Sequence, residues 1–365
     1  MIDVDAFRAE AAGWLADNKK AAPRDYGAIL PPDMRDQGLA WQRRIFDAGF
    51  AGIHRPEEYG GRGLTPEHTG VWIEQCALAS VPPFINMVGV VLAGGSVLLF
   101  GTDEQKKEHL RPIISGERVW CQLFSEPGAG SDLASLATRA EQDGDEYILS
   151  GQKVWCSNGR ISDWGICMAR TGAPDSKHRG ISFFLVDMHL TGIDVRPLRQ
   201  MTGGAEFDEV FLDNVHVPAT CLLGGENEGW KVGMATLTNE RGHIGASTIG
   251  LQRRLDSMAA LGGGLDAVHR DELAGLIARG QSYLALAQRQ GPVASVAASL
   301  MKLGVTEMLF DVAVLREALA GPEGMLVNDA SLGVLGAPAG RIAGGTTQVQ
   351  RNIIGERILG LPKEP

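Results

Sequence analysis

The amino-acid sequence predicts an α+β protein, in which a helical first third and a helical final third flank a β-rich middle. Apolar residues recur every three or four positions in the outer thirds, as in amphipathic helices. Between them, short apolar or β-branched runs alternate with turns containing Gly, Asp and Asn. A chain of 365 residues, 44% of them hydrophobic, is long enough for two or three domains. We expect an N-terminal α-helical domain (1–118), an antiparallel β-barrel domain (119–224) and a C-terminal four-helix bundle (225–365).

The helical pattern of the first third begins at Asp5. The apolar residues that follow it at three- and four-residue steps are Phe7, Ala11, Trp14 and Leu15. The same periodicity predicts helices over 39–50, 67–79 and 103–110. The glycine-rich segment 55–63 interrupts this pattern and lacks the preceding strand of a nucleotide-binding loop, so we expect a tight turn there.

The middle third contains several short apolar runs of the length expected for β-strands. These runs predict strands at 120–124, 146–150, 165–170, 181–186 and 209–212. The Gly-rich segment 224–229 ends this region, and Ala/Leu-rich helical patterns follow it. We expect breaks between the final helices near Gly262, Gly291 and Gly321.

Composition excludes several classes of protein. The longest apolar run, 88–100, is too short to span a bilayer and holds three glycines, and the acidic residues near the N-terminus are unlike a secretory signal. We therefore expect a cytoplasmic protein without a membrane span. The net charge is −10 and no Lys/Arg block exceeds a pair, which argues against nucleic-acid binding. The five cysteines and eight histidines are scattered, so we expect neither disulfides nor a metal site.

Sequence motifs of common enzyme classes are missing. The sequence has no Gly-x-Gly-x-x-Gly between a strand and a helix, no Walker motif, no Gly-x-Ser-x-Gly and no His-Glu-x-x-His. Dinucleotide-binding Rossmann units, P-loop nucleotidases, serine esterases and zinc proteases of the usual kinds are therefore not supported.

Two turns are the most informative segments of the chain. Residues 123–132 read Leu-Phe-Ser-Glu-Pro-Gly-Ala-Gly-Ser-Asp, and residues 151–159 read Gly-Gln-Lys-Val-Trp-Cys-Ser-Asn-Gly. Glycines allow a ligand to approach the backbone, and the hydroxyls of Ser125, Ser131 and Ser157 can bind its polar groups, beside the flat apolar ring of Trp155. Either turn alone is equally compatible with an ordinary surface loop.

Together these turns resemble the flavin-binding segments of the acyl-CoA dehydrogenase family, and the resemblance extends through most of the chain. In that family the Trp packs against the isoalloxazine ring of FAD and the hydroxyls bond its polar edge. The cofactor contacts that the resemblance implies are Gln122, Leu123, Phe124, Ser125, Gly130, Ser131, Trp155, Cys156, Ser157, Thr346, Thr347 and Gln348. The last three begin the C-terminal helix, where an ordinary N-cap is the alternative interpretation.

The resemblance implies oxidation of an acyl-CoA to the trans-2-enoyl-CoA, with electrons passed to an electron-transfer flavoprotein. Removal of the α-proton needs a carboxylate in a dry pocket. Many family members place a Glu just before a Gly-Thr near the C-terminus, where this chain has Gly344. Another branch places its Glu on the helix that begins the last domain, and Glu240 matches that position. The substrate contacts that the resemblance implies are Ser131, Thr238, Asn239, Arg241 and Gly345.

The helical pattern around Glu240 tests this assignment. The residues of one helical stripe are Trp230, Met234, Leu237, Arg241, Ile244 and Thr248. At 100° per residue Glu240 lies about 60° from the centre of that stripe. A carboxylate beside an apolar stripe can have the raised pKa of a useful base, whereas the alternative is a salt bridge at a domain interface.

Three other functions remain open. Gly344 favours a non-catalytic subunit of a heteromeric acyl-CoA dehydrogenase, as in steroid side-chain enzymes, whereas family members more generally form homodimers or homotetramers. A flavin oxidase or monooxygenase would share the fold and the cofactor. A scaffold without cofactor would not need Ser125, Trp155 and Ser157. The acyl group cannot be read from the sequence, because the packing of helices sets the depth of the pocket.

Overall fold

The computed structural model describes residues 2–24, 26, 29–241, 244–260, 264–287 and 293–362. The side chains of 238–250, 254, 287 and 293–298 lie outside this description. The chain divides into two compact units, Met1–Glu240 and Arg241–Pro365. The domain boundaries expected from the sequence, after residues 118 and 224, stay a prediction.

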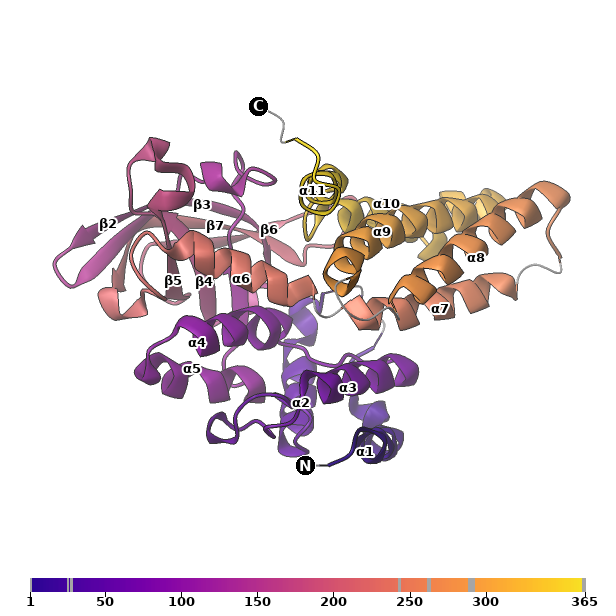
Figure 1. The fold of residues 1–365 in the computed structure, drawn as a ribbon, viewed down its shortest axis with the longest axis horizontal. Helices are drawn as coiled ribbons and strands as arrows, with labels where there is room; N and C mark the ends of the chain where they lie inside the picture. Colours follow the sequence, from indigo (N-terminus) through magenta and orange to yellow (C-terminus); the bar gives the residue numbers. More distant parts are fainter. Residues whose placement is uncertain are drawn as a thin grey trace. The chain divides into compact units, whose positions relative to one another are not determined.

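The first unit begins with a group of helices (Figure 1). Aromatic side chains of these helices pack against one another. The helices of this part are α1 (Val4–Asn18), α2 (Arg35–Asp47), α3 (Pro66–Ala79), α4 (Gly94–Phe100) and α5 (Asp103–Ser115). Phe50 stacks on Trp72 with ring centroids 4.5 Å apart, and both rings are buried. The predicted helical character is confirmed, although the apolar run 88–100 was not recognised as a helix. It forms a π-helix (Val88–Ala93) that continues into α4.

The predicted turn at 55–63 packs against this π-helix. Arg55 Nη2 donates a hydrogen bond to the carbonyl of Val90 at 3.1 Å. Burial lowers the pKa of Arg55 to about 10. A Cβ on Gly61 would lie 2.1 Å from the Arg55 carbonyl oxygen. The backbone at residue 61 can therefore approach Arg55 this closely only if residue 61 is glycine.

The middle of the chain forms a seven-stranded sheet with the order β1-β4-β2-β3-β7-β6, in which β5 also pairs with β4. The strands are β1 (Trp120–Leu123), β2 (Arg139–Asp143), β3 (Glu146–Ser157), β4 (Trp164–Arg170), β5 (Ile181–Asp187), β6 (Ile193–Leu198) and β7 (Phe207–Pro218). The β-domain is confirmed, and most neighbours are antiparallel as expected. However, β1 and β4 run parallel, because the connection through β2 and β3 is long enough to return the chain in the same direction.

Helix α6 (Gly229–Arg241) follows the sheet and ends at the boundary of the first unit. At its start, a Cβ on Gly229 would lie 2.3 Å from the backbone of Ser182, so only glycine permits this contact with β5. Further along, the Thr236 hydroxyl lies 2.6 Å from the Ser96 hydroxyl of α4, and both side chains are buried. The helix that carries Glu240 is thus fixed to both the sheet and the N-terminal helices (Figure 1).

The second unit is helical, as predicted. Its helices are α7 (Ile244–Ala259), α8 (Ala267–Ala287), α9 (Val293–Leu319), α10 (Asp329–Ile342) and α11 (Thr347–Ile353), which continues as a π-helix (Ile354–Ile358). Its core contains Leu255, Met258, Met301 and Met308. A 3₁₀ turn begins at Gly321, whereas the expected breaks at Gly262 and Gly291 lie outside the described residues. No helix in the described ranges is long and apolar enough to cross a membrane.

Candidate flavin site

The structure brings the two predicted ligand-binding turns together. The first follows β1 and the second ends β3. The backbone N–H of Val154 donates to the carbonyl of Ser125 at 2.9 Å, so the turns lie side by side in the first unit. Their adjacency depends on the sheet and could not be read from either motif alone.

Trp155 adopts an unusual conformation between these turns. The pairing of β3 with β7 shifts register between Lys153 and Cys156, and Trp155 lies in this bulge with φ 62°. The left-handed conformation costs a non-glycine residue about 1–2 kcal/mol. The side chain is nevertheless 56% exposed and makes an edge contact with Phe207, whose centroid is 5.8 Å away. Strain at an exposed aromatic side chain is typical of a residue placed for a ligand.

The turn after β3 is fixed by Asp208 of the neighbouring strand. The backbone N–H and the Nε of Arg160 donate to the Asp208 carboxylate at 2.9 and 2.6 Å, and Arg160 Nη2 donates to the carbonyl of Ala205. Burial raises the pKa of Asp208, and the hydrogen bonds and charge of Arg160 partly oppose that shift. Asn158 takes the left-handed conformation, with φ 58°, and its N–H donates to Glu206. Ser157 therefore sits on a rigid turn.

A pocket lies against this turn. Ser157 and Asn158 line it together with apolar side chains that include Leu30, Phe84 and Met87. Trp120 Nε1 and Asn158 Oδ1 also belong to lining residues, and both are buried polar atoms without a hydrogen-bond partner in the part of the chain that the structure describes. Both atoms are shielded from the open space of the pocket, so they do not by themselves offer hydrogen bonds to a ligand there.

The remaining predicted contacts of the first unit differ in accessibility. Gly130 and Ser131 are exposed, and Gln122, Ser125 and Ser157 are half-buried. Phe124 is buried, and its ring makes an edge contact with Phe183. Leu123 and Cys156 belong to the core of the sheet, so they can offer a ligand only their backbone groups.

The predicted base and most predicted substrate contacts cannot be placed as side chains. Thr238, Asn239, Glu240 and Arg241 belong to α6, but their side chains lie outside the described residues. Their roles remain predictions.

The C-terminal stretch is well defined within the second unit. Gly344 and Gly345 have φ values of 65° and 94°, and Gln350 Nε2 donates to the Gly344 carbonyl at 3.1 Å. Thr346 caps α11 by accepting from Val349 N at 3.3 Å, so the N-cap interpretation holds at that residue. The Thr347 hydroxyl donates to Glu307 at 2.9 Å and is buried. Gln348 is exposed.

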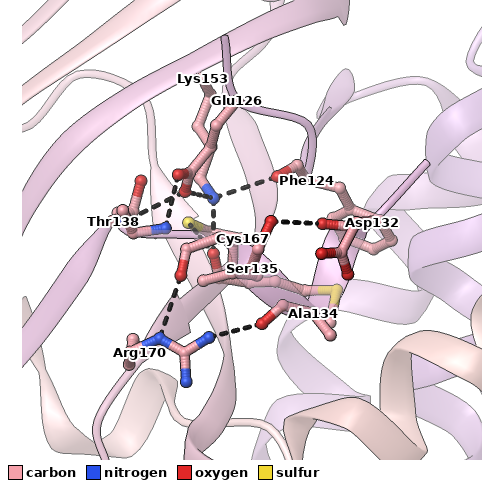
Figure 2. Close-up of polar contacts among 12 residues, drawn as sticks. Phe124, Glu126, Asp132, Ala134, Ser135, Thr138, Lys153, Cys167 and Arg170 are labelled. Atoms are coloured by element: carbon pink, nitrogen blue, oxygen red, sulfur yellow. Dashed lines mark hydrogen bonds and ion pairs between the residues drawn. The ribbon is translucent and has the colours of Figure 1, made fainter. Parts of the chain in front are cut away.

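A buried ion pair beneath the two turns was missed in the sequence. Lys153 is fully buried and contacts Glu126 at 2.8 Å (Figure 2). The available signals were a lysine directly before the apolar residues Val154, Trp155 and Cys156, and a glutamate within the other turn, because a buried charge needs a partner. Among the described residues no three His, Cys, Asp or Glu side chains form a group that could hold a metal ion.

These features define a protein with an N-terminal helical region, a seven-stranded β-sheet and a second, helical unit. Sequence models of the acyl-CoA dehydrogenase N-terminal, middle and C-terminal domains match residues 4–117, 121–215 and 277–359. The chain belongs to the acyl-CoA dehydrogenase family, a family of oxidoreductases that typically bind FAD.

Several relatives match along the whole chain. It is 38% identical to acyl-CoA dehydrogenase IpdE1 of Mycobacterium tuberculosis, over 100% of this chain and 99% of the relative. It is also 38% identical to acyl-CoA dehydrogenase FadE34 of the same organism, but there 100% of this chain covers 50% of the relative. Among solved structures it resembles the Tcur3481-Tcur3483 steroid ACAD, with a TM-score of 0.83, 26% identity, and coverage of 99% and 98% of the two chains.

Proposed function

We propose that the protein binds FAD and oxidises the α,β-bond of an acyl-CoA thioester to give the trans-2-enoyl-CoA. The observation that carries this proposal is the strained, exposed Trp155 beside the turn of Ser157, a residue that lines a pocket with apolar walls. A flat ligand with an apolar face and a polar edge fits this combination. The isoalloxazine ring of FAD has that shape and chemistry.

The two turns would hold the flavin ring. Trp155 offers a flat apolar surface, and the hydroxyls of Ser125 and Ser157 offer hydrogen bonds to the polar edge. Bound FAD supplies the acceptor for the β-hydrogen and its electron pair. We propose that an electron-transfer flavoprotein then collects the electrons.

Glu240 is our proposed base for the α-proton. It lies at the end of α6, which is fixed at Gly229 and at Thr236. Gly344 has no side chain to accept a proton, and its positive φ disfavours a glutamate at that position. A base on α6 would therefore replace the base that many family members carry near the C-terminus.

The decisive experiment follows the absorbance of the flavin. The full chain is purified and mixed without oxygen with short, branched, long and steroid-like acyl-CoAs. Bleaching by one class supports the dehydrogenase and identifies its substrate, whereas oxygen consumption in place of enoyl-CoA formation supports an oxidase or monooxygenase. Colourless protein that takes up no added FAD refutes the proposal.

Glu240→Gln tests the base. Removal of a general base lowers rates about 10²–10⁴-fold. The matched control is Glu228→Gln, because Glu228 is an exposed carboxylate just before α6. The assignment of Glu240 is wrong if Glu240→Gln retains FAD and most of the dehydrogenation rate.

A heteromeric enzyme is the second candidate. Gly344 stands where many family members carry the base. The steroid ACAD structure is named for two proteins, Tcur3481 and Tcur3483. This chain covers half of FadE34, whose remaining length equals a second chain of this size. In this arrangement a second family member supplies part of the site or the base. The test is size and activity after expression alone and with a neighbouring family member. Full activity of a homodimer or homotetramer rejects this candidate.

A further inference from the structure

The buried ion pair Glu126–Lys153 in the first unit has no role in the proposed reaction. Lys153 Nζ donates to the carbonyls of Phe124 and Met168 at 3.1 and 2.7 Å and to Glu126 Oε1 at 2.8 Å. An ammonium has three N–H donors, so each has an acceptor. Figure 2 shows these bonds converging on the Lys153 nitrogen.

The carboxylate has its own fixed surroundings. Glu126 Oε2 accepts from Ala137 N at 2.6 Å, and Oε1 accepts from Thr138 N at 2.9 Å. These bonds close the loop between residues 126 and 137, which carries Gly130 and Ser131. Arg170 supports the far side of this loop, because its guanidinium donates to the carbonyls of Ala134 and Leu136 at 2.7 and 3.0 Å (Figure 2).

The pair therefore joins the segments that the proposed flavin site needs. Lys153 immediately precedes the bulge that holds Trp155, and it bonds the carbonyl that directly precedes Ser125. Val154 adds the second bond between the same segments, to the Ser125 carbonyl. Removing either charge would allow the two turns to shift relative to each other.

We propose that Glu126 and Lys153 are positioning residues that set the relative placement of Ser125, Trp155 and Ser157 for the flavin ring. This inference rests on the proposed function. The pair has a fixed polarity: carbonyl oxygens surround the ammonium and backbone N–H groups face the carboxylate. A simple exchange of the two residues would place each charge among groups of the wrong sign.

The test measures FAD affinity, the visible spectrum of bound FAD and thermal unfolding for Glu126→Gln, Lys153→Met, the double variant and the exchanged pair Glu126→Lys/Lys153→Glu. Each single variant should weaken FAD binding at least tenfold and shift the flavin band, and the exchanged pair should not restore either. The double variant should bind FAD less weakly than the sum of the single effects predicts, because no charge is left unpaired.

A matched control comes from the same domain. Arg139 and Glu141 form an exposed ion pair at 3.3 Å on β2, and Arg139→Met with Glu141→Gln should leave both the affinity and the spectrum unchanged. If a single variant does not fold, the double variant decides. Variants that unfold at lower temperature but bind FAD with wild-type affinity and spectrum would overturn the positioning role. FAD-loaded wild type that no acyl-CoA bleaches would refute only the proposed reaction, and wild type that binds no FAD would refute both.

Discussion

Replacing Trp155 by glycine separates the strain at this residue from its proposed contact with flavin. Trp155 is 56% exposed, so less than half of its surface is covered. For a side chain of about 250 Å² this is about 110 Å², or about 3 kcal/mol at about 25 cal/mol per Å². Glycine relieves about 1–2 kcal/mol of left-handed strain and loses about 0.5–1 kcal/mol through its extra freedom in the unfolded chain. The variant should therefore be less stable by about 1–3 kcal/mol.

The expected effect on FAD is separate from this modest loss of stability. Stacking on an aromatic side chain contributes about 1–3 kcal/mol, so Trp155→Gly should weaken FAD binding about 5- to 150-fold. Fluorescence titration of the flavin-free protein measures the affinity, and thermal unfolding measures the stability. Trp155→Phe keeps a flat ring and should retain most of the affinity.

A second control tests the support of the ring. Phe207→Leu removes the edge contact at 5.8 Å and leaves Trp155 in place. It should change the affinity for FAD by less than Trp155→Gly. Unchanged FAD affinity in Trp155→Gly, together with the expected loss of stability, would refute the role of this side chain in binding the cofactor.

Three further predictions concern pH and glycine positions. Burial lowers the pKa of His109 in the folded protein to about 4, so protonation of this side chain favours the unfolded chain. The free energy of unfolding should therefore fall as the pH drops from about 6.5 to 4, by at most about 3 kcal/mol. His109→Phe should flatten the pH dependence of thermal unfolding over this range. Gly61→Ala should destabilise by about 1–3 kcal/mol because of the 2.1 Å approach to the Arg55 oxygen, whereas Gly70→Ala, in open space on α3, should stabilise by about 0.5–1 kcal/mol in the same assay. Gly344→Glu should not raise the dehydrogenation rate, because φ 65° disfavours a side chain there, and a rate increase would contradict this geometry.

The sequence predicted strands where the structure buries continuous apolar runs. The expected ranges 165–170 and 181–186 nearly coincide with β4 and β5, whose residues are almost all buried. In contrast, β2 and β6 were missed. Arg139–Asp143 has one buried residue, and Ile193–Leu198 has none that is fully buried, so neither carries a strong apolar pattern. Their strand character comes from pairing with β3 and β7, which is a tertiary effect.

In the candidate site, too, local motifs could be read from the sequence, whereas tertiary contacts could not. The composition of the two turns drew attention to Ser125, Trp155 and Ser157, and the resemblance of the paired turns to the family made these residues predicted flavin contacts. The partners that fix these residues lie elsewhere in the sequence, such as Asp208 for the turn after β3. No local pattern links such residues, because the sheet register brings them together. The sequence could also not indicate that Leu123 and Cys156 face the core.

The strain at Trp155 and the buried pair at Lys153 are parts of one arrangement. A left-handed tryptophan persists only if its neighbours prevent the strand from relaxing into regular pairing. On one side, Lys153 is held by its three acceptors and Val154 by Ser125; on the other, Cys156 returns to register opposite Asp208 and is fully buried. The residue between these fixed points has little backbone freedom, so the position from which its ring extends is set before any ligand arrives. Such preorganisation lowers the entropic cost of binding, which is why loosening the Lys153 side should weaken FAD binding even though Trp155 itself is unchanged.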